Sequence, residues 1–394
     1  MESFPVPSLP EELLAEIFLR APSLEDLARI SMANNYCHDI ISDPYFVRCV
    51  PLHRYPSFFL GFFTRDGFKP VQPPHPSASI SNLLLTASDL SFSFLPFPGS
   101  WIVQDICDGR ALLSRSHGSK GDQESIFMHL AVCDPLSRRY VLLPPLPDDL
   151  YTYVQDLCHN GFNYRCETFL VPRGECVVAE TSFKVIWMAR GHKKLLVLIF
   201  SSVVGKWHAV TSLDGQCIGK VISFSRRVHS RRSYAYGCFY WKMGEARKVL
   251  ALDTRKMEFF FSNSPLGYLE YDCAVVEAGE GRLGIFALFH HMTGTRLHLY
   301  CTTKKKEAWS TDEWCLEKTI QLPPTAHDYR IMCATNGYLF MQYTQGSSYP
   351  SSKYGYILMG VKTFLFERFY ETNRPSSFPT PYFGFPPSLS PPSI

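Results

Sequence analysis

Enzymatic chemistry in this chain would have to come from its acidic side chains, its histidines or its cysteines. Glycoside hydrolysis requires two carboxylates held across a cleft, and the acidic candidates are Asp105 with Asp108, and Asp148 with Asp149. Both pairs lie near turn-forming residues, and the sequence identifies no partner carboxylate for either. Three further aspartates stand where β-turns need an oxygen to accept local N–H bonds: Asp134, Asp214 and Asp253. We therefore expect these acids to serve turns.

Metal binding and nucleophilic catalysis have no better support. His290 and His291 follow the apolar run IFALF, but neighbouring residues of a strand point to opposite faces and cannot readily share an ion. The same objection applies to Cys158 and His159. The 13 cysteines contain no CxxC pair, so neither a zinc ribbon nor a redox motif is indicated. A GxSxG elbow and a P-loop are missing too, and we expect no cofactor and no metal.

Two basic clusters remain, RRVHSRR at residues 226–232 and KKK at residues 304–306. The first is interpreted as a nuclear localisation patch, as a dock for an acidic or phosphorylated partner, or as a solvated loop between strands, and we favour the loop. The formal net charge is only +3, so bulk charge indicates neither nucleic acid nor an anionic membrane as a partner.

Composition favours a β-rich protein of two or three domains. Of the 394 residues, 19% are charged and 14% aromatic, with 29 prolines and 24 glycines, which suits short strands joined by tight turns. The N-terminus lacks the features of a signal peptide. The longest apolar stretch, residues 195–204, is far shorter than the ~20 residues that span a bilayer. We expect buried thiols and a cytoplasmic or nuclear location, or both.

The elements that would position a site begin with three short helical patterns in residues 7–51. The first is predicted to start at a capping box between Ser8 and Glu11, and it carries apolar residues at helical spacing: Leu13, Leu14, Ile17 and Phe18. The second follows Pro22, and the third, residues 35–41, ends before a proline. Helices of this size bury too little to stand alone, so their apolar face is either an interface or a packing surface.

These residues carry a resemblance. The run LPEELLAEIFLRAPSLEDLARISMA and the closing IISDPYF resemble an F-box, and the arrangement is similar to plant F-box proteins with a C-terminal β-propeller-like associated domain. The resemblance implies docking on a Skp-family adaptor and, through it, on cullin and RING subunits of a ubiquitin ligase. It implies these adaptor-binding residues: Leu9, Pro10, Leu13, Leu14, Ile17, Phe18, Leu24, Leu27, Ala28 and Ser31. The closing residues that fit are Ile40, Ile41, Asp43, Pro44 and Phe46.

The chain departs from the family pattern before the closing helix. Asn35 and Cys37 stand where the family usually has a basic residue and a tryptophan. Losing a large buried aromatic costs roughly 3–5 kcal/mol if nothing compensates, so the departure bears on adaptor affinity. One alternative is a helical cap that only packs on the β domain.

The rest of the chain repeats a strand pattern. Each predicted unit opens with a turn and an apolar strand, at residues 108–115, 183–190, 236–242, 281–288 and 336–342. Predicted hairpins follow at residues 130–145, 195–210, 249–261, 297–316 and 356–367. Four strands about every 45–50 residues are typical of propeller blades, and the available length favours six blades, with five as an alternative. A β-sandwich or irregular barrel is the other alternative.

We therefore predict an α+β multidomain chain: a three-helix F-box module at residues 1–50, a linker with a possible first strand at 51–81, an all-β propeller-like domain at 82–372 and a Pro-rich disordered tail at 373–394. The tail contains aromatic residues that would suit a docking peptide, although a frayed terminus is the favoured interpretation.

The functional prediction is a non-catalytic substrate-recognition subunit of an SCF-type cullin–RING E3 ubiquitin ligase. The β domain would bind a protein substrate, which the sequence does not identify, and neither nucleic acid nor a membrane is expected as a partner. Two alternatives stay open: an interaction scaffold with a degenerate F-box that does not bind the adaptor, and a propeller hydrolase with an accidental helical cap.

Overall fold

The computed structural model describes residues 9–21, 24–33, 35–43, 46, 59–97, 101–115, 129–135, 138–147, 165–172, 182–190, 194–214, 232–242, 248–265, 272–291, 294–302, 313–324, 326–346, 353–375 and 379–383. The chain divides into two compact units. Unit 1 comprises residues 1–143, 179–181 and 380–394, and unit 2 comprises residues 144–178 and 182–379. Among the described residues, none of the helices has the length and apolarity needed to cross a membrane.

Unit 1 contains the described helices: α1 (Glu11–Phe18), α2 (Leu24–Ala33), α3 (Asn35–Ser42) and α5 (Ala78–Ala87). The predicted capping box is wrong, because the N-cap of α1 is Pro10, two residues after Ser8, and Pro10 makes no side-chain cap hydrogen bond. The Pro10 carbonyl instead accepts the N–H groups of Leu13 and Leu14 at 3.0 and 3.1 Å. Proline is suited to this place because its ring fixes φ and it has no N–H to leave unpaired. Ser8 lies outside the described residues.

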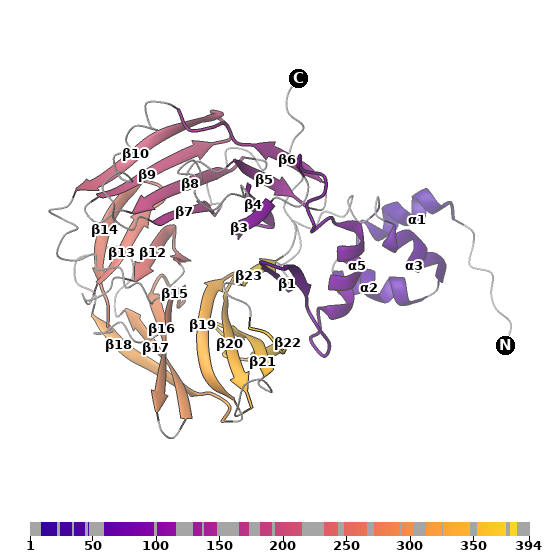
Figure 1. Ribbon diagram of the computed structural model, residues 1–394. Helices are drawn as coiled ribbons and strands as arrows, with labels where there is room; N and C mark the ends of the chain where they lie inside the picture. Colours follow the sequence, from indigo (N-terminus) through magenta and orange to yellow (C-terminus); the bar gives the residue numbers. More distant parts are fainter. Residues whose placement is uncertain are drawn as a thin grey trace. The chain divides into compact units, whose positions relative to one another are not determined.

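Unit 1 also contains two antiparallel sheets. One has the order β2–β1–β23 and joins β1 (Phe59–Thr64), β2 (Gly67–Pro70) and β23 (Thr380–Phe383). The other has four strands in chain order: β3 (Trp101–Cys107), β4 (Arg110–Arg115), β5 (Leu130–Asp134) and β6 (Arg139–Leu142). Figure 1 shows β23, from the end of the chain, beside β1, from near its start.

Unit 2 contains four sheets of four antiparallel strands, again in chain order. The first has β7 (Arg165–Leu170), β8 (Lys184–Arg190), β9 (Lys194–Ser201) and β10 (Lys206–Asp214). The second has β11 (Ser233–Ala235), β12 (Cys238–Lys242), β13 (Lys248–Asp253) and β14 (Glu258–Asn263). The third has β15 (Cys273–Glu277), β16 (Leu283–His291), β17 (Gly294–Thr302) and β18 (Trp314–Gln321). The fourth has β19 (His327–Thr335), β20 (Tyr338–Gln345), β21 (Lys353–Gly360) and β22 (Phe366–Thr372).

The six sheets formed by the described strands are the blades of a six-bladed β-propeller. The predicted propeller of six blades is therefore confirmed, and the sandwich alternative is not; the predicted F-box stays a prediction. All five predicted opening strands and all five predicted hairpins overlap strands of the four-stranded sheets, and each opening strand is the second strand of its sheet. In three sheets the first hairpin turns through a residue and a glycine that both have positive φ, the conformation that matches the twist of adjacent strands. These turns are Asp108–Gly109, Tyr236–Gly237 and Asn336–Gly337.

Two sequence predictions are wrong at the ends of the β region. Residues 82–372 contain five sheets, because the sixth sheet is built from residues 59–70 and Thr380–Phe383. The latter segment lies in the tail that was predicted to be disordered. Its register places Tyr382 opposite Gly61 and Thr380 opposite Phe63, so its backbone is satisfied by the other end of the chain. The expected boundary at residue 81 falls inside α5.

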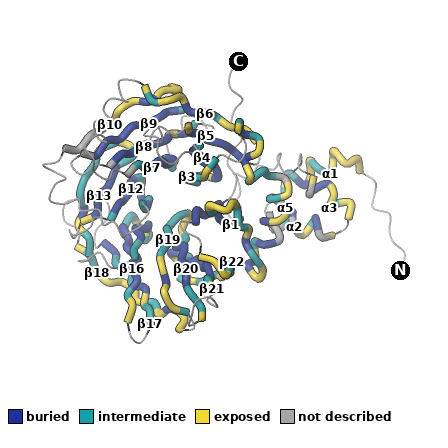
Figure 2. The backbone as a smooth tube through the Cα atoms, viewed as in Figure 1, coloured by how far each residue is buried: buried dark blue, intermediate teal, exposed yellow. Residues whose placement is uncertain are grey.

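One hydrophobic core joins the helices of unit 1 to its sheets. It contains Phe18 from α1, Leu27 from α2, Ile41 from α3, Leu60 from β1 and Leu113 from β4. Helix α5 adds a polar tie, since the Ser81 hydroxyl donates to the Leu60 carbonyl oxygen at 2.7 Å. The buried residues, dark blue in Figure 2, lie mostly along the central strands of the sheets. The helices are therefore integral to unit 1.

Consecutive sheets of unit 2 also share cores. One cluster joins the first and second sheets, another the second and third, and a third the third and fourth. A polar contact spans the first pair: Arg232 pairs with Glu167 at 2.8 Å and lies over the Phe169 ring at 4.2 Å. Because these sheets bury one another, each contributes to the stability of its neighbours.

Position 355 requires glycine because the ring of Tyr343 covers it. Gly355 in β21 lies directly opposite Tyr343 in β20, and an added Cβ would overlap that ring. We expect Gly355→Ala to lower the free energy of unfolding by about 1–3 kcal/mol through overpacking, as measured by urea denaturation. The penalty should persist in a Tyr343→Phe background and largely disappear in a Tyr343→Val background. An equal penalty in both backgrounds would contradict the ring contact as its cause.

Asp89 orders the turn that carries Phe92 and Leu95 into the core of unit 1. Its carboxylate accepts bonds from the N–H and hydroxyl groups of Ser91 and Ser93 at 2.5–3.1 Å. Partial burial raises the pKa of Asp89, but these hydrogen bonds outweigh it and the net pKa lies below the ordinary value. A lowered folded-state pKa means that the stabilisation is present above the unfolded pKa and is lost as pH falls through the folded value.

We therefore expect Asp89→Ala to cost about 1 kcal/mol at pH 7, as removal of a capping side chain does. The difference between the natural chain and the variant should shrink as pH falls below about 4, near the ordinary pKa of aspartate. Urea denaturation at a series of pH values between neutrality and pH 3 measures it. A difference that grows in acid would contradict the assigned sign.

Candidate functional site

Helix α1 exposes an apolar stripe. Leu9 before the helix and Leu13 and Ile17 within it are 40%, 47% and 51% exposed. They are spaced four residues apart, so they lie along one face of the helix. Pro10 is exposed beside them, and the neighbouring glutamates of α1 are exposed as well. The exposed apolar stripe, defined as Leu9, Pro10, Leu13 and Ile17, therefore presents apolar side chains with an acidic flank.

The other predicted adaptor-binding residues divide into two groups. Phe18, Leu27 and Ser31 are buried, and Phe18 and Leu27 belong to the core of unit 1. Leu14 is half-buried against the same core. Leu24 and Ala28 belong to α2, but their side chains lie outside the described residues. The helical spacing alone could not separate the exposed face from the buried one.

The segment from Ile40 to Phe46 packs its apolar side chains into the core of unit 1. Ile40, Ile41 and Phe46 are buried in the core of unit 1. The Asp43 carboxylate accepts the N–H of Phe46 at 3.2 Å, a local bond that turns the chain after α3. Pro44 lies outside the described residues. These side chains hold the stripe in place without forming part of its surface.

Cys37 is half-buried and packs against the core of unit 1. It occupies the position where the resembling family usually has tryptophan. Tyr36, beside it in α3, is 50% exposed and was not among the predicted site residues. In the sequence, the exposure of Tyr36 is indicated only by its position in α3, on a different side of the helix from Cys37, Ile40 and Ile41, which face the core.

Of the acidic residues that could have indicated catalysis, Asp108 and Asp253 lie at turns, whereas Asp105 lies within a strand. The Asp253 carboxylate accepts the N–H groups of Arg255 and Lys256 at 2.8 and 3.1 Å in the β13–β14 turn. Asp105 is in β3, Asp108 has positive φ in the following turn, and Asp134 is buried at the end of β5. Asp214 ends β10, and Asp148 and Asp149 lie outside the described residues.

Burial raises the pKa of Asp272, an acid that the sequence analysis did not single out. The positive charges of Arg330, Lys242 and His290 and a backbone hydrogen bond from Ile331 oppose that effect. Asp272 precedes β15, and its carbonyl oxygen accepts the Leu288 N–H at 3.0 Å. A single carboxylate among cations does not provide the pair of acids that glycoside hydrolysis needs.

The histidines and the two basic clusters are the remaining residues that could bind an ion. Over the part of the chain that the structure describes, no three His, Cys, Asp or Glu side chains are placed to hold an ion. His290 and His291 end β16, and His290 Nδ1 lies 3.2 Å from the Thr295 hydroxyl. Of the first basic cluster only Arg232 is described, and it pairs with Glu167. Cys158, His159 and the cluster at residues 304–306 lie outside the described residues.

Comparisons with known proteins are limited to distant structures, since no family model and no curated protein matches the chain. One similar structure is a mutant of the Aleuria aurantia lectin with Fucalpha1-6GlcNAc, at 8% identity, covering 68% of this chain and 77% of that one, with a TM-score of 0.34. Another is the WD40 domain of SCAP from fission yeast, at 9% identity, covering 71% and 72%, with a TM-score of 0.28.

A third similar structure is an oligogalacturonate lyase in complex with manganese, at 8% identity, covering 79% of this chain and 84% of that one, with a TM-score of 0.33. Similarity this distant carries no inference about what this chain binds. The candidate site therefore rests on the geometry of α1.

The difference between buried and exposed residues of α1 can be measured as a difference in the free energy of unfolding of their variants. We expect Phe18→Ala to lower the free energy of unfolding by about 3–5 kcal/mol, because it removes a buried aromatic ring. Leu13→Ser and Ile17→Ser should each change it by less than about 0.5 kcal/mol, as substitutions at exposed positions do. Urea denaturation of the full-length variants measures both. A large loss from either serine variant would mean that the stripe is already covered within the molecule.

Proposed function

We propose that this chain is a substrate-recognition subunit of an SCF-type ubiquitin ligase, with α1 docking on a Skp-family adaptor. The observation that carries the proposal is the exposed apolar stripe on a helix whose opposite face is anchored in the core of unit 1. The sequence resemblance to an F-box covers the same residues. Propeller folds commonly mediate protein interactions, which fits a role in holding a substrate.

The stripe has enough apolar surface to contribute to an interface. Full burial of a leucine or isoleucine side chain stabilises by about 1.5–3 kcal/mol, and Leu9, Leu13 and Ile17 are each close to half exposed. Covering them would therefore contribute a few kcal/mol before the costs of association. Their exposure also explains the need for a partner, because three aligned apolar side chains on one short helix otherwise remain in water.

The shared core gives the proposed docking helix a fixed orientation relative to the sheets of unit 1. Phe18 and Leu27 reach the same buried cluster as Leu60 and Leu113. A ligase of this type acts by proximity: it holds a substrate near a charged ubiquitin-conjugating enzyme, so that an encounter becomes effectively intramolecular. Rigid attachment preserves that effect better than a flexible linker would. In this proposal the chain itself performs no covalent step.

The adaptor proposal is tested by co-purification of the full-length chain with a Skp-family adaptor. We expect stable binding by the natural chain and at least a tenfold loss for the double variant Leu13→Glu and Ile17→Glu, because two carboxylates would be desolvated in an apolar interface. Glu12→Gln, an exposed neighbour on α1, is the matched control and should bind like the natural chain. Urea denaturation confirms that each variant remains folded.

Cys37 distinguishes the ligase from a scaffold with a degenerate docking module. If the natural chain binds the adaptor, Cys37 is compatible with docking. If the natural chain is folded and fails to bind, while Cys37→Trp creates binding, the natural protein does not act through this adaptor and the proposal is overturned. The chain would then be an interaction protein that uses its β-propeller without a ligase.

A further inference from the structure

Two cysteines of unit 2 lie directly opposite each other on neighbouring strands. Strands β17 and β18 are antiparallel, and their register pairs Cys301 with Cys315. Directly opposed residues of such strands have Cα atoms about 4.5 or 5.5 Å apart, and both values fall within the range of about 4.4–6.8 Å found for disulfides. Both residues are free thiols. The backbone therefore allows a disulfide between them without separating the strands.

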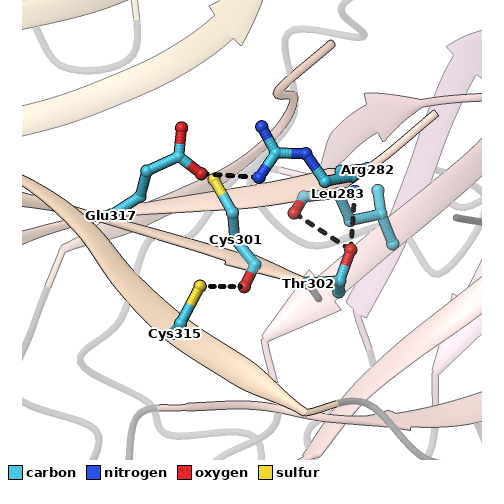
Figure 3. A network of polar contacts seen from close by, with 6 residues as sticks. All are labelled: Arg282, Leu283, Cys301, Thr302, Cys315 and Glu317. Carbon is cyan, nitrogen blue, oxygen red and sulfur yellow. Dashed lines mark hydrogen bonds and ion pairs between the residues drawn. The ribbon is translucent and has the colours of Figure 1, made fainter. Parts of the chain in front are cut away.

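The two thiols differ in their surroundings. Cys315 is exposed, and its Sγ donates to the Cys301 carbonyl oxygen at 3.5 Å. Cys301 is buried, and its thiol hydrogen bonds to the Glu317 carboxylate. Figure 3 shows the Cys301 sulfur beside Glu317 and the Cys315 sulfur beside the Cys301 carbonyl oxygen. Rotation about the side-chain bonds of both cysteines, with loss of these two contacts, would direct the sulfur atoms toward each other.

Burial keeps the inner thiol protonated, and Glu317 adds to this effect. Its carboxylate pairs with Arg282 at 2.7 Å. The hydrogen bond from Cys301 and then the bond from Arg282 lower the pKa of Glu317. Burial, followed by the effects of Glu317, raises the pKa of Cys301 to about 12. The thiolate is the reactive form, so Cys301 stays inert on its own, and the exposed Cys315 is the thiol that meets an oxidant first.

We propose that Cys301 and Cys315 form an oxidation site at which hydrogen peroxide converts the two thiols into a cross-strand disulfide. The Cys315 sulfur first attacks peroxide: an S–O bond forms, the O–O bond breaks, and water leaves, giving a sulfenic acid. The Cys301 sulfur then attacks the Cys315 sulfur. The S–S bond forms, the S–O bond breaks, and the departing hydroxide takes the Cys301 proton as water. Two thiols lose two electrons, and one peroxide becomes two waters.

The disulfide would tie the outer strand of its sheet to a buried one. Residues 315–319 of β18 are exposed, whereas Cys301 belongs to the core that the third and fourth sheets share. Oxidation removes the thiol donor from Glu317 and leaves its pairing with Arg282. Thiol reductants would restore the original state by exchange. This inference is independent of the proposed adaptor docking.

The test treats the full-length chain with graded hydrogen peroxide, blocks remaining thiols by alkylation, and digests the protein without reduction. Mass spectrometry should detect a peptide pair joined through Cys301 and Cys315 that dithiothreitol separates. The linked peptides should be absent from the Cys315→Ser variant. The control variant Leu316→Ser, changed at an exposed neighbour in β18, should form them at the rate of the natural chain. Thermal denaturation confirms that both variants are folded.

Glu317→Gln provides a second readout that a structural role alone would not give. Removing the carboxylate lowers the barrier to deprotonating Cys301, so we expect the disulfide to form several-fold faster at a fixed peroxide concentration. Oxidation of Cys315 to sulfinic acid without any linked peptide would overturn the proposal. So would linkage of Cys315 mainly to another cysteine.

Discussion

The packing around Phe63 is the constraint on which unit 1 depends. This ring in β1 lies 4.9 Å from Phe68 of β2, 5.5 Å from Phe92 and 5.8 Å from Tyr382 of β23. It therefore joins β1 to its neighbour β2, to the turn that carries Phe92, and to β23, the last described strand. The same buried cluster contains the inner faces of α1, α2 and α3. Because the helices share it, the proposed docking helix is held by the interactions that close the β2–β1–β23 sheet.

The repeated part of the fold could be predicted from sequence because its contacts are local. Each predicted hairpin joins adjacent strands, and turns such as Asn336–Gly337 adopt the positive φ angles that short hairpins require. The three-stranded sheet could not be found in this way. The proline-rich surroundings of Thr380–Phe383 indicate disorder, and only pairing with β1, more than 300 residues earlier, supplies its hydrogen bonds.

The candidate sites show the same limit at the level of side chains. Helical spacing placed Leu13, Ile17 and Phe18 in one apolar set. Which of them is buried depends on how α2 and α3 pack against α1: Phe18 is buried, and Leu13 and Ile17 are exposed. The opposition of Cys301 and Cys315 depends on a register shift between Leu299 and Tyr300 in β17. A single-residue shift changes every cross-strand pair beyond it, so the cysteine positions alone do not reveal the pair.

The central claim is that α1 is a docking surface supported by the core of unit 1. The most direct measurement is amide hydrogen exchange of the full-length chain with and without a purified Skp-family adaptor. The account predicts slower exchange along residues 11–19 in the complex, with little change in β4 and β5, which are buried and already protected. Protection confined to the sheets, with exchange in α1 unchanged, would contradict it and place the binding surface on the β-propeller.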